Sequence, residues 1–505
     1  MAVIGLGTMG AGIVEVFARA GLAVTAIEVD KAALARGMTA LDASLAQAQA
    51  RGRLTAGERD QVLGRVTAAA DLAAAANAGL VVEVVPERMD IKRQIFAALD
   101  QACSPEAILV TNTSSLPVTA IAAGSQYPGR VAGMHFFNPA PVMRLVEVVA
   151  AVQTDPATTE AVTGLVRSLG KTPVSVTDRA GFVANALLLP YLNHAVSLLA
   201  AGYATREDID TAARAGIGLP MGPLALLDLI GLDTSLAIME VLAGEFGGAR
   251  CTPAPLLRRM TEAGRTGRKS GRGFYDYGQD SPPAPGPAPT VPRSDSHPLL
   301  SSVTLIDGAA DRDGLATAAA LAAMIEAAGI TVATGEGDLV VVAASPDAPV
   351  LAAALAAAPA GRPAGAAGLH VAGGRVAEVI STVQSSDGAA ARAAALGRGL
   401  GLEVVRCPDR PGFLVGALLY PHLNDAVRMV QDGYASAADV DTAMTLGCGY
   451  PRGPLAMLDD IGAGRVQAVL AAMYGRSGDP AFAPAALLAD HAAAGLAFHA
   501  GGPGQ

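Results

Sequence analysis

An internal repeat constrains the fold of this chain more than any other feature of its sequence. The segment that begins at Asp178, DRAGFVANALLLPYLNHAV, returns at Asp409 as DRPGFLVGALLYPHLNDAV, and GIGLPMGPLALLDLIG returns as GCGYPRGPLAMLDDIG. Aligned without gaps, about 30 of roughly 54 positions are identical, which is far beyond chance. The similarity begins further upstream, because RLVEVVAAVQTD resembles RVAEVISTVQSS and sets Glu378 opposite Glu147. The sequence therefore predicts a duplicated unit in which strands are followed by helices.

The second copy lacks parts of the first. No Gly-x-Gly-x-x-Gly occurs between Ser301 and Gly374, and GMHFFNPAPVMRLVEV has shortened to GLHVAGGRVAEV. Asn185 of the first copy is replaced by Gly416. We therefore expect the second copy to be a scaffold and not a second active site.

Short β-rich runs alternate with helix-compatible segments in roughly the first 150 residues, which predicts an α/β fold with a mostly parallel sheet covered by helices. From about Thr158 to Asp276 the pattern is almost wholly helical, and a proline-dense segment typical of a semi-rigid linker follows. A chain of 505 residues is also too long for one hydrophobic core. The expected parts are a Rossmann-type NAD-binding domain (1–155), an all-helical domain (156–278), a proline-rich linker (279–298), a degenerate Rossmann-like segment (299–400) and a second helical domain (401–505).

The motif GLGTMG follows the first predicted strand and opens a helix. Glycines in this pattern allow a tight turn, let a pyrophosphate approach the backbone and permit close packing of strand and helix, while the helix N-terminus offers amide donors. No Gly-x-x-x-x-Gly-Lys-[Ser/Thr] occurs, so an ATP-type phosphate loop is excluded. The loop residues expected to contact a dinucleotide are Gly5, Gly7, Thr8, Met9 and Gly10.

An acidic residue ends the second predicted strand. Glu28 follows the glycine loop by about 18 residues, where a carboxylate can accept hydrogen bonds from the adenosine ribose. A carboxylate there would repel a 2′-phosphate, so NAD is favoured over NADP. The alternative is a solvated glutamate at a strand end.

The stretch GMHFFNPAPVMRLVEV places His135 before a Phe-Phe-Asn-Pro turn and Glu147 in an apolar run. If the turn at Asn138 to Pro141 folds the two flanking strands together, His135 and Glu147 can form a proton-transfer pair. Histidine accepts a proton near neutral pH, and a carboxylate behind it orients the ring and stabilises the imidazolium. The alternative is a histidine held by its neighbours in an ordinary core.

Composition excludes several other classes of protein. The net charge of -10 gives no electrostatic footprint for nucleic acid, although local basic residues could hold a phosphorylated ligand. The uncharged segment Ala180 to Thr205 is long enough to span a membrane, but its repeat carries Asp425 and Arg428, which favours a buried helix and no membrane contact. Four scattered cysteines and the absence of a signal region favour the cytoplasm, with no disulfide framework and no metal site.

Six motifs together resemble the L-3-hydroxyacyl-CoA dehydrogenase family of fatty acid β-oxidation. They are GLGTMGAGI, NTSSL, HFFNPAPVMRLVEV, GFVANALLLPYLNHAV, GLPMGPLALLDLIGLD and KSGRGFYDY, and they follow the family's order over residues 1 to about 277. The long form with a degraded second copy is also similar to the 3-hydroxyadipyl-CoA dehydrogenases of phenylacetate catabolism. The resemblance implies an enzyme that uses NAD to oxidise a 3-hydroxyacyl-CoA to the 3-ketoacyl-CoA.

The resemblance also implies roles for individual residues. His135 would be the general base, paired with Glu147, while Ser114 and Asn185 would lie beside the substrate. The implied contacts with the cofactor are Glu87, Lys92, Ser114, Asn138 and Lys269, and those with coenzyme A are Ser44 and Arg51. Some of these residues have purely structural alternatives: Ser114 could cap a helix, Asn138 could only make the turn, and the two lysines could be solvated. At Arg51 the family usually offers a lysine nearby.

The family fold implies that the acyl-CoA closes into a cleft between the Rossmann-type and helical domains, and that the helical domain commonly mediates dimerisation. We expect either a homo-oligomer or an internal pseudo-dimer, in which the second helical copy, about Asp409 to Gly495, replaces a partner subunit. Two other functions stay open: a 3-hydroxyacid dehydrogenase acting on free acids, although its usual catalytic lysine is missing from GFVANALLLPYLNHAV, and a noncatalytic NAD-binding protein.

Overall fold

The computed structural model describes residues 1–278, 302–307, 312–333, 339–347, 349–350, 366–383 and 385–499. The linker expected at 279–298 lies outside these residues. The chain divides into two compact units. Unit 1 consists of Met1–Ala186 with Met429–Gly453, and unit 2 consists of Leu187–Arg428 with Pro454–Gln505.

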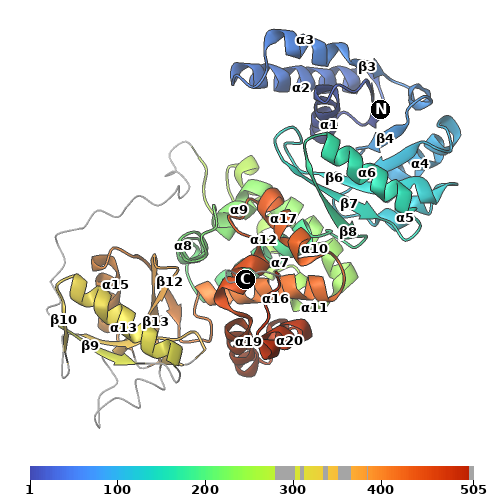
Figure 1. Cartoon of the computed structure of the whole chain (residues 1–505). Coiled ribbons are helices and arrows are strands. Elements are labelled where there is room, and N and C mark those ends of the chain that lie inside the picture. The colour runs from blue at the N-terminus through green and yellow to red at the C-terminus, as the bar shows by residue number, and fades with distance from the viewer. Residues whose placement is uncertain are drawn as a thin grey trace. The chain divides into compact units, whose positions relative to one another are not determined.

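An eight-stranded sheet with the order β3-β2-β1-β4-β5-β6-β7-β8 forms the centre of unit 1 (Figure 1). Every neighbouring pair is parallel except β6 and β7, which form an antiparallel hairpin. The strands are β1 (Ala2–Ile4), β2 (Val24–Ile27), β3 (Val66–Ala69), β4 (Leu80–Glu83), β5 (Ile108–Thr111), β6 (Val131–Phe136), β7 (Leu145–Ala150) and β8 (Thr172–Thr177). Because β8 pairs along the whole of β7, the sheet extends to residue 177, past the domain boundary expected at 155.

Helices cover both faces of this sheet. Phe17 of α1 and Val166 of α6 are fully buried in one core cluster with alternate strand residues such as Val82. Phe96 of α4 and Ile121 of α5 are buried outside that cluster, as expected for helices on the other face. The helices are α1 (Thr8–Arg19), α2 (Lys31–Ala50), α3 (Ala56–Gly64), α4 (Met89–Ala102), α5 (Val118–Ala122) and α6 (Pro156–Ser168). The expected α/β fold of the N-terminal domain is confirmed.

Unit 2 holds most of both helical copies. The first contains α7 (Ala184–Ala200), α8 (Arg206–Thr211), the π-helical turn η3 (Ala212–Ile217), α9 (Pro223–Ile230), α10 (Leu232–Phe246), α11 (Gly248–Cys251) and α12 (Pro255–Glu262). The second contains α16 (Val415–Gln431), α18 (Pro454–Ile461), α19 (Ala463–Ser477) and α20 (Ala486–Ala494). Helix α7 packs on its repeat α16: Nε2 of His194 lies 3.0 Å from the carbonyl oxygen of Ala417, and Arg250 forms an ion pair with Asp425 of α16. Among the described residues, no helix is long and apolar enough to cross a membrane.

The second copy also has a sheet, in the region where a degenerate Rossmann-like segment was expected. Its described strands have the order β10-β9-β11-β12-β13-β14, and β12 and β13 form an antiparallel hairpin like that of β6 and β7. The elements are β9 (Ser302–Asp307), α13 (Arg312–Ala327), β10 (Thr331–Ala333), β11 (Leu339–Ala343), β12 (Ala366–Ala372), β13 (Val376–Ser381), α15 (Asp387–Gly399) and β14 (Glu403–Pro408). Since β14 pairs with β13, this sheet passes the boundary expected at 400.

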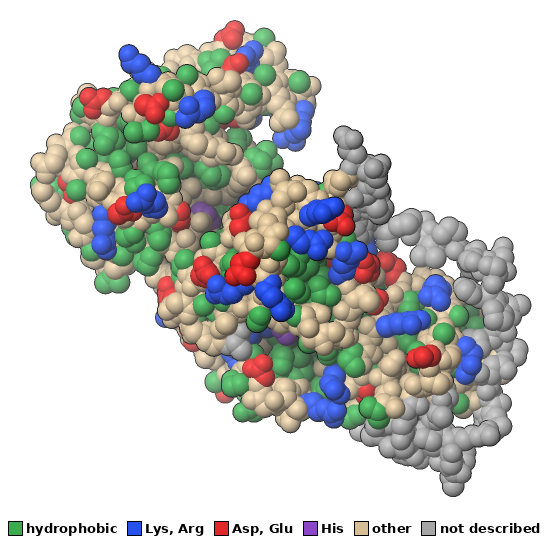
Figure 2. Space-filling model, turned by 180° about the vertical axis from the view of Figure 1, so that it is seen from behind, with side chains coloured by type: hydrophobic (Ala, Val, Ile, Leu, Met, Phe, Trp, Pro, Cys, Tyr) green, Lys and Arg blue, Asp and Glu red, His purple; other side chains and the backbone are tan. Residues whose placement is uncertain are grey.

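Charged side chains are interspersed on the face of the molecule that Figure 2 shows. Neither the basic nor the acidic side chains form a broad patch of one sign there. On this face, the described residues form no continuous basic surface of the kind that tracks a phosphate backbone.

Candidate active site

Each glycine of the nucleotide loop has a separate steric role. Gly5 has a φ of +94°, and a Cβ there would lie 2.7 Å from the carbonyl oxygen of Val84. A Cβ on Gly10 would lie 1.8 Å from the carbonyl oxygen of Gly5, so helix α1 can start this close to the strand only with glycine. A Cβ on Gly7 would meet nothing within 4 Å. The open space at Gly7, at the uncapped N-terminus of α1, suits a pyrophosphate.

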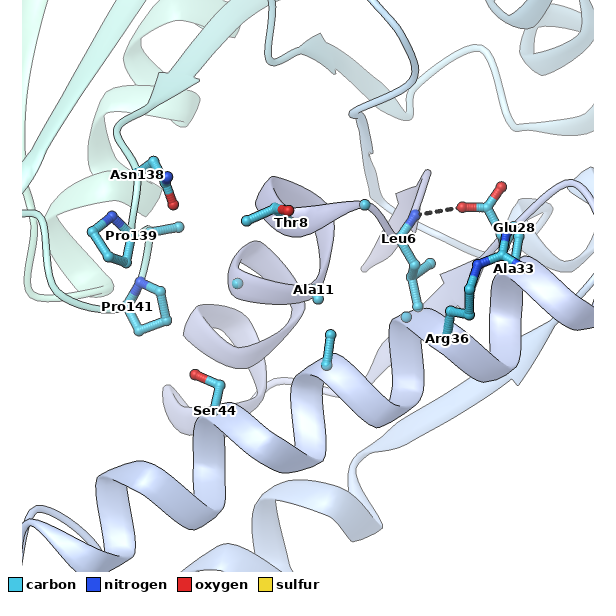
Figure 3. A pocket seen from close by; sticks show the side chains of 15 residues that line it. Leu6, Thr8, Ala11, Glu28, Ala33, Arg36, Ser44, Asn138, Pro139 and Pro141 are labelled. Carbon is cyan, nitrogen blue, oxygen red and sulfur yellow. Dashed lines mark hydrogen bonds between the residues drawn. The ribbon is translucent and has the colours of Figure 1, made fainter. Parts of the chain in front are cut away.

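A cavity of about 430 Å³ lies along this loop. One wall carries Glu28, whose carboxylate accepts hydrogen bonds from the backbone N–H groups of Leu6 (2.8 Å) and Val29 (2.7 Å). Asn138 and Pro139 line the opposite wall, with Thr8 between the two walls (Figure 3). Of the residues expected to contact the cofactor, Gly7, Thr8, Glu28 and Asn138 therefore line one cavity, which fits a dinucleotide.

Glu87 organises the loop after β5. Its carboxylate accepts hydrogen bonds from the backbone N–H groups of Ser114 (2.9 Å) and Ser115 (3.0 Å) and from the hydroxyl of Thr113 (2.6 Å). Burial raises the pKa of the Glu87 carboxyl, but the Lys92 ammonium and these hydrogen bonds outweigh burial, so the pKa is lowered below its usual value. Ser114 is thereby fixed at the carboxyl end of β5, half-buried.

Lys92 is buried and paired, so the alternative of a solvated surface lysine is wrong for it. Its side chain is 0% exposed, and its ammonium donates to Glu83 at 2.8 Å and lies 3.4 Å from Glu87. An unpaired ammonium at this depth would be expensive, and the two carboxylates compensate the cost of burial. Because the ammonium of Lys92 pairs with Glu87, it helps to hold the carboxylate that binds residues 113–115.

His135 and Glu147 meet as the sequence predicts. They are directly opposed in the antiparallel register of β6 and β7, and Nδ1 of His135 lies 2.7 Å from Oε2 of Glu147. Glu147 is fully buried, and its Oε1 accepts from the backbone N–H groups of Val183 (3.1 Å) and Ala184 (3.0 Å) at the start of α7. The amides fix the carboxylate, the carboxylate fixes the imidazole, and Nε2 is left as the ring nitrogen that can exchange a proton.

Two aromatic rings hold the imidazole. The ring centroid of Phe137 lies 4.6 Å from that of His135, and that of Phe182 lies 5.7 Å away. Asn185 follows Ala184 in the first turn of α7, next to the amide that Glu147 accepts. The β6–β7 hairpin and the first turn of α7, which carries Asn185, therefore meet at the His135–Glu147 pair.

The remaining predicted residues lie further from this pair. Ser44 lines the cavity and donates its hydroxyl to Glu15 at 2.6 Å, while Arg51 is exposed at the C-terminal end of α2. Lys269 belongs to unit 2, where its ammonium lies 2.6 Å from Asp233. The contacts of Ser44 and Arg51 with coenzyme A and of Lys269 with the cofactor stay predictions.

Sequence reasoning missed a lysine that holds the turn between β6 and β7. The ammonium of Lys171 donates to the carbonyl oxygens of Ala140 and Met143, both at 2.7 Å. Burial, with a smaller contribution from Arg19, lowers the pKa of Lys171 to about 8. The signal for this role was weak, since one lysine at the end of a helix is ordinary and its partners are backbone atoms.

Sequence reasoning also missed a second histidine–glutamate pair. Nδ1 of His370 lies 2.7 Å from Oε2 of Glu378, and Oε1 of Glu378 accepts from the N–H groups of Leu414 (2.8 Å) and Val415 (2.7 Å) at the start of α16. Phe413 lies 5.5 Å from the His370 ring, as Phe182 does at the first pair. The signal was present as Gly-Leu-His opposite Gly-Met-His, but the shorter turn obscured the alignment.

The predicted functional groups lie at one edge of the first sheet. The glycine loop, Glu28, the Glu87 region, Ser114 and His135 follow or end parallel strands at their carboxyl ends, which is where ligands bind in open α/β sheets. The fold and the cavity together define a Rossmann-type dehydrogenase that takes NAD.

Comparison with known proteins places the chain within this class. The family model described as "3-hydroxyacyl-CoA dehydrogenase, NAD binding domain" matches residues 1–179, and that of the family's C-terminal domain matches residues 181–277 and 412–504. The chain belongs to the 3-hydroxyacyl-CoA dehydrogenase family. The second match of the C-terminal domain confirms that the helical part is duplicated.

Individual relatives show how far the similarity extends. The chain is 36% identical over 493 residues to the 3-hydroxyadipyl-CoA dehydrogenase of Escherichia coli K12, which covers 97% of each chain. It is 48% identical over 279 residues to a 3-hydroxybutyryl-CoA dehydrogenase of Mycobacterium tuberculosis, which covers 54% of this chain and 97% of the relative. The crystal structure of 3-hydroxybutyryl-CoA dehydrogenase from E. coli K12 matches 98% of each chain with a TM-score of 0.79 at 33% identity. The first copy thus resembles short relatives, and the whole chain resembles a long one.

Proposed function

We propose that His135 is the general base of the reaction and accepts the hydroxyl proton of an L-3-hydroxyacyl-CoA. NAD, when bound, supplies the acceptor for the hydride that leaves C3. As the C3–H bond breaks with its electron pair, the hydroxyl proton passes to Nε2 of His135 and the C3–O bond becomes a carbonyl. The observation that carries this proposal is the 2.7 Å contact between His135 and a fully buried Glu147, held by two backbone amides, on the sheet whose first strand leads into the glycine loop.

The surrounding groups support this reaction. Glu147 keeps the proton of the neutral imidazole on Nδ1, which leaves a lone pair on Nε2, and it stabilises the imidazolium that forms. Ser114, fixed by Glu87, is suited to hold the substrate hydroxyl, and Asn185 is suited to orient the acyl group. Ser44 and Arg51 are assigned to coenzyme A.

For the acyl group we propose short chains, with 3-hydroxybutyryl-CoA and the dicarboxylic 3-hydroxyadipyl-CoA both accepted. The first substrate appears in the names of relatives of the N-terminal half, and the second in the name of a relative over the full length. A distal carboxylate calls for a cation that faces it, and the first helical copy offers three arginines as candidates. Each already has a neighbour: Arg206 pairs with Glu207, Arg214 lies 3.9 Å from Glu403, and Arg268 lies over Tyr277.

A panel of substrates tests this function. Formation of NADH, followed by absorbance, is expected with 3-hydroxybutyryl-CoA and with 3-hydroxyadipyl-CoA. Free 3-hydroxybutyrate should have a kcat/KM lower by about 100-fold or more, because the binding energy of the coenzyme A part is lost. Equal rates with the free acid would favour the 3-hydroxyacid dehydrogenase alternative, and no turnover of any member would favour a noncatalytic protein.

We also propose that the two helical copies replace a dimer interface within one chain. The packing of α7 on α16 supports this, because these two helices are equivalent parts of the two copies, and the ion pair between Arg250 of α11 and Asp425 of α16 adds a second contact between the copies. We expect the full chain to sediment as a single species near its chain mass of 50.5 kDa. A species of twice that mass, unchanged on dilution, would contradict the proposal.

A further inference from the structure

Part of the second copy lies on the catalytic sheet of the first. Helix α17 (Ala437–Cys448) belongs by sequence to the second copy but by its contacts to unit 1, where it packs on β7 and β8. The carbonyl oxygen of Tyr434 accepts from the backbone N–H of Thr177 at 3.0 Å, at the end of β8. The guanidinium of Arg179 lies 4.4 Å from the centroid of the Tyr434 ring. The segment from Tyr434 onward is thus anchored to β8, the edge strand of the sheet that carries the candidate active site.

Gly447 makes the closest approach. A Cβ built on it would lie 2.6 Å from Cδ2 of Leu145 and 3.3 Å from Cε1 of Phe137. The first distance is shorter than real carbon contacts allow, and Leu145 is fully buried in β7. Because Gly447 has no side chain, the backbone of α17 can lie directly against Leu145 and Phe137.

Phe137 connects this contact to the proposed base. Its ring packs on His135 from one direction while Phe182 packs from another. The next residue of α17, Cys448, lies close enough to Glu147 for the two to interact electrostatically: burial, and then the Glu147 carboxylate, raise the pKa of the Cys448 thiol to about 12. The bare backbone of α17 at Gly447 thus lies against the Phe137 ring that packs on His135.

The first copy makes the reciprocal contact within unit 2. Gly216, which aligns with Gly447, has its built Cβ 2.6 Å from Cγ2 of Val415, and the hydroxyl of Tyr203, which aligns with Tyr434, donates to the carbonyl oxygen of Phe413 at 2.8 Å. Helix α8 packs on β14, as α17 packs on β8. A helix of each copy therefore packs on the sheet of the other copy, but only the first sheet carries the glycine loop.

We propose that Gly447 of the second copy is a positioning residue for the dehydrogenase reaction, because its contact with Phe137 and Leu145 holds the aromatic wall that orients His135. The inference rests on the proposed role of His135 as the base. It gives the degenerate copy a use, since the copy has lost its own nucleotide loop but retains the helix that completes the first active site.

The test compares Gly447→Val with Gly216→Val in the full-length chain. Both variants place a branched side chain where a built Cβ is 2.6 Å from its nearest neighbour, so both should lose thermal stability. Gly447→Val should lower kcat for 3-hydroxybutyryl-CoA by about 10-fold or more, because small displacements of a catalytic group cost rate steeply. Its KM for NAD should change less than about twofold, and the isotope effect of substrate deuterated at C3 should rise as hydride transfer becomes limiting. Gly216→Val should keep kcat and the isotope effect.

Further variants keep the test decisive if a valine variant misfolds. If either valine variant does not fold, Gly447→Ala and Gly216→Ala decide in its place, with a loss of kcat expected only for the first. Truncation of the opposing side chain in the Gly447→Val/Leu145→Ala double variant should restore part of the rate. The inference is overturned if Gly447→Val or Gly447→Ala keeps full kcat, or if the Gly216 variant loses as much. His135→Gln distinguishes a failure of this inference from a failure of the proposed base. Full activity of His135→Gln would contradict the proposal that His135 is the base.

Discussion

Replacement of His135 by glutamine is expected to lower kcat by about 10²- to 10⁴-fold, the usual contribution of a general base. Glutamine is close to histidine in size and can still hydrogen-bond to Glu147, so the hairpin should persist, but its side-chain amide accepts no proton near neutral pH. NAD binding should be unchanged within about twofold, because the cavity along the glycine loop does not include His135. Steady-state kinetics with 3-hydroxybutyryl-CoA and titration of protein fluorescence with NADH would measure both.

The chain contains its own control for this variant. His370 has the same 2.7 Å contact with a buried glutamate, and its side chain is 17% exposed compared with 8% for His135. His370→Gln should cost similar stability and leave kcat unaltered, because no glycine loop precedes this second pair in the sequence. If His370→Gln lost activity as His135→Gln did, the pair would be a structural clamp in both copies and the base assignment would be withdrawn.

Local sequence patterns were sufficient to predict which residues meet in the His135–Glu147 pair. The glycine loop, the acidic end of the second strand and the Phe-Phe-Asn-Pro turn each act over a few residues, where backbone geometry and chain direction leave few alternatives. His135 and Glu147 meet because the turn reverses the strand and the register places them opposite each other. The pattern of residues on two neighbouring strands was sufficient for this prediction.

Contacts that depend on how one element packs on another were harder to predict from the sequence. Lys92 could not be recognised as buried, because its charge is compensated by Glu83 and Glu87, which precede its helix. Strand β8 was assigned to a helical region because an edge strand that is half-exposed lacks a continuous apolar run. The contact of α17 with β7 joins segments roughly 300 residues apart, and no local periodicity encodes such a pairing.

The retained pair in the second copy changes how the first should be interpreted. Glu147 and Glu378 each accept two amides at the start of a helix, so each tethers a strand to the first helix of its helical copy, α7 or α16. This tether is favourable without any cofactor, because a carboxylate at a helix N-terminus satisfies amides that otherwise lack partners. Geometry alone therefore does not distinguish a catalytic pair from a structural one, and the proposed catalytic role of His135 rests in addition on the glycine loop, Ser114 and Asn185.

Replacement of Glu147 by glutamine is expected to lower kcat by about 10²- to 10⁴-fold while the fold is retained. The amide oxygen of glutamine can still accept from Val183 and Ala184, but its NH₂ group would then face Nδ1 of His135. To accept that hydrogen bond the imidazole must move its proton to Nε2, and the nitrogen that should take the substrate proton is then already protonated.

Two comparisons separate this effect from a loss of stability. Glu378→Gln changes the same contacts in the second copy, so it should lower the melting temperature to a similar extent and leave kcat within about twofold. The double variant His135→Gln/Glu147→Gln should be no slower than the slower of the two single variants, because both changes disable one proton transfer and groups that act as a unit are not additive. If the losses of the two single variants multiplied in the double variant, Glu147 would act independently of His135. If Glu147→Gln left kcat unchanged, the role of Glu147 would be limited to tethering β7 to α7.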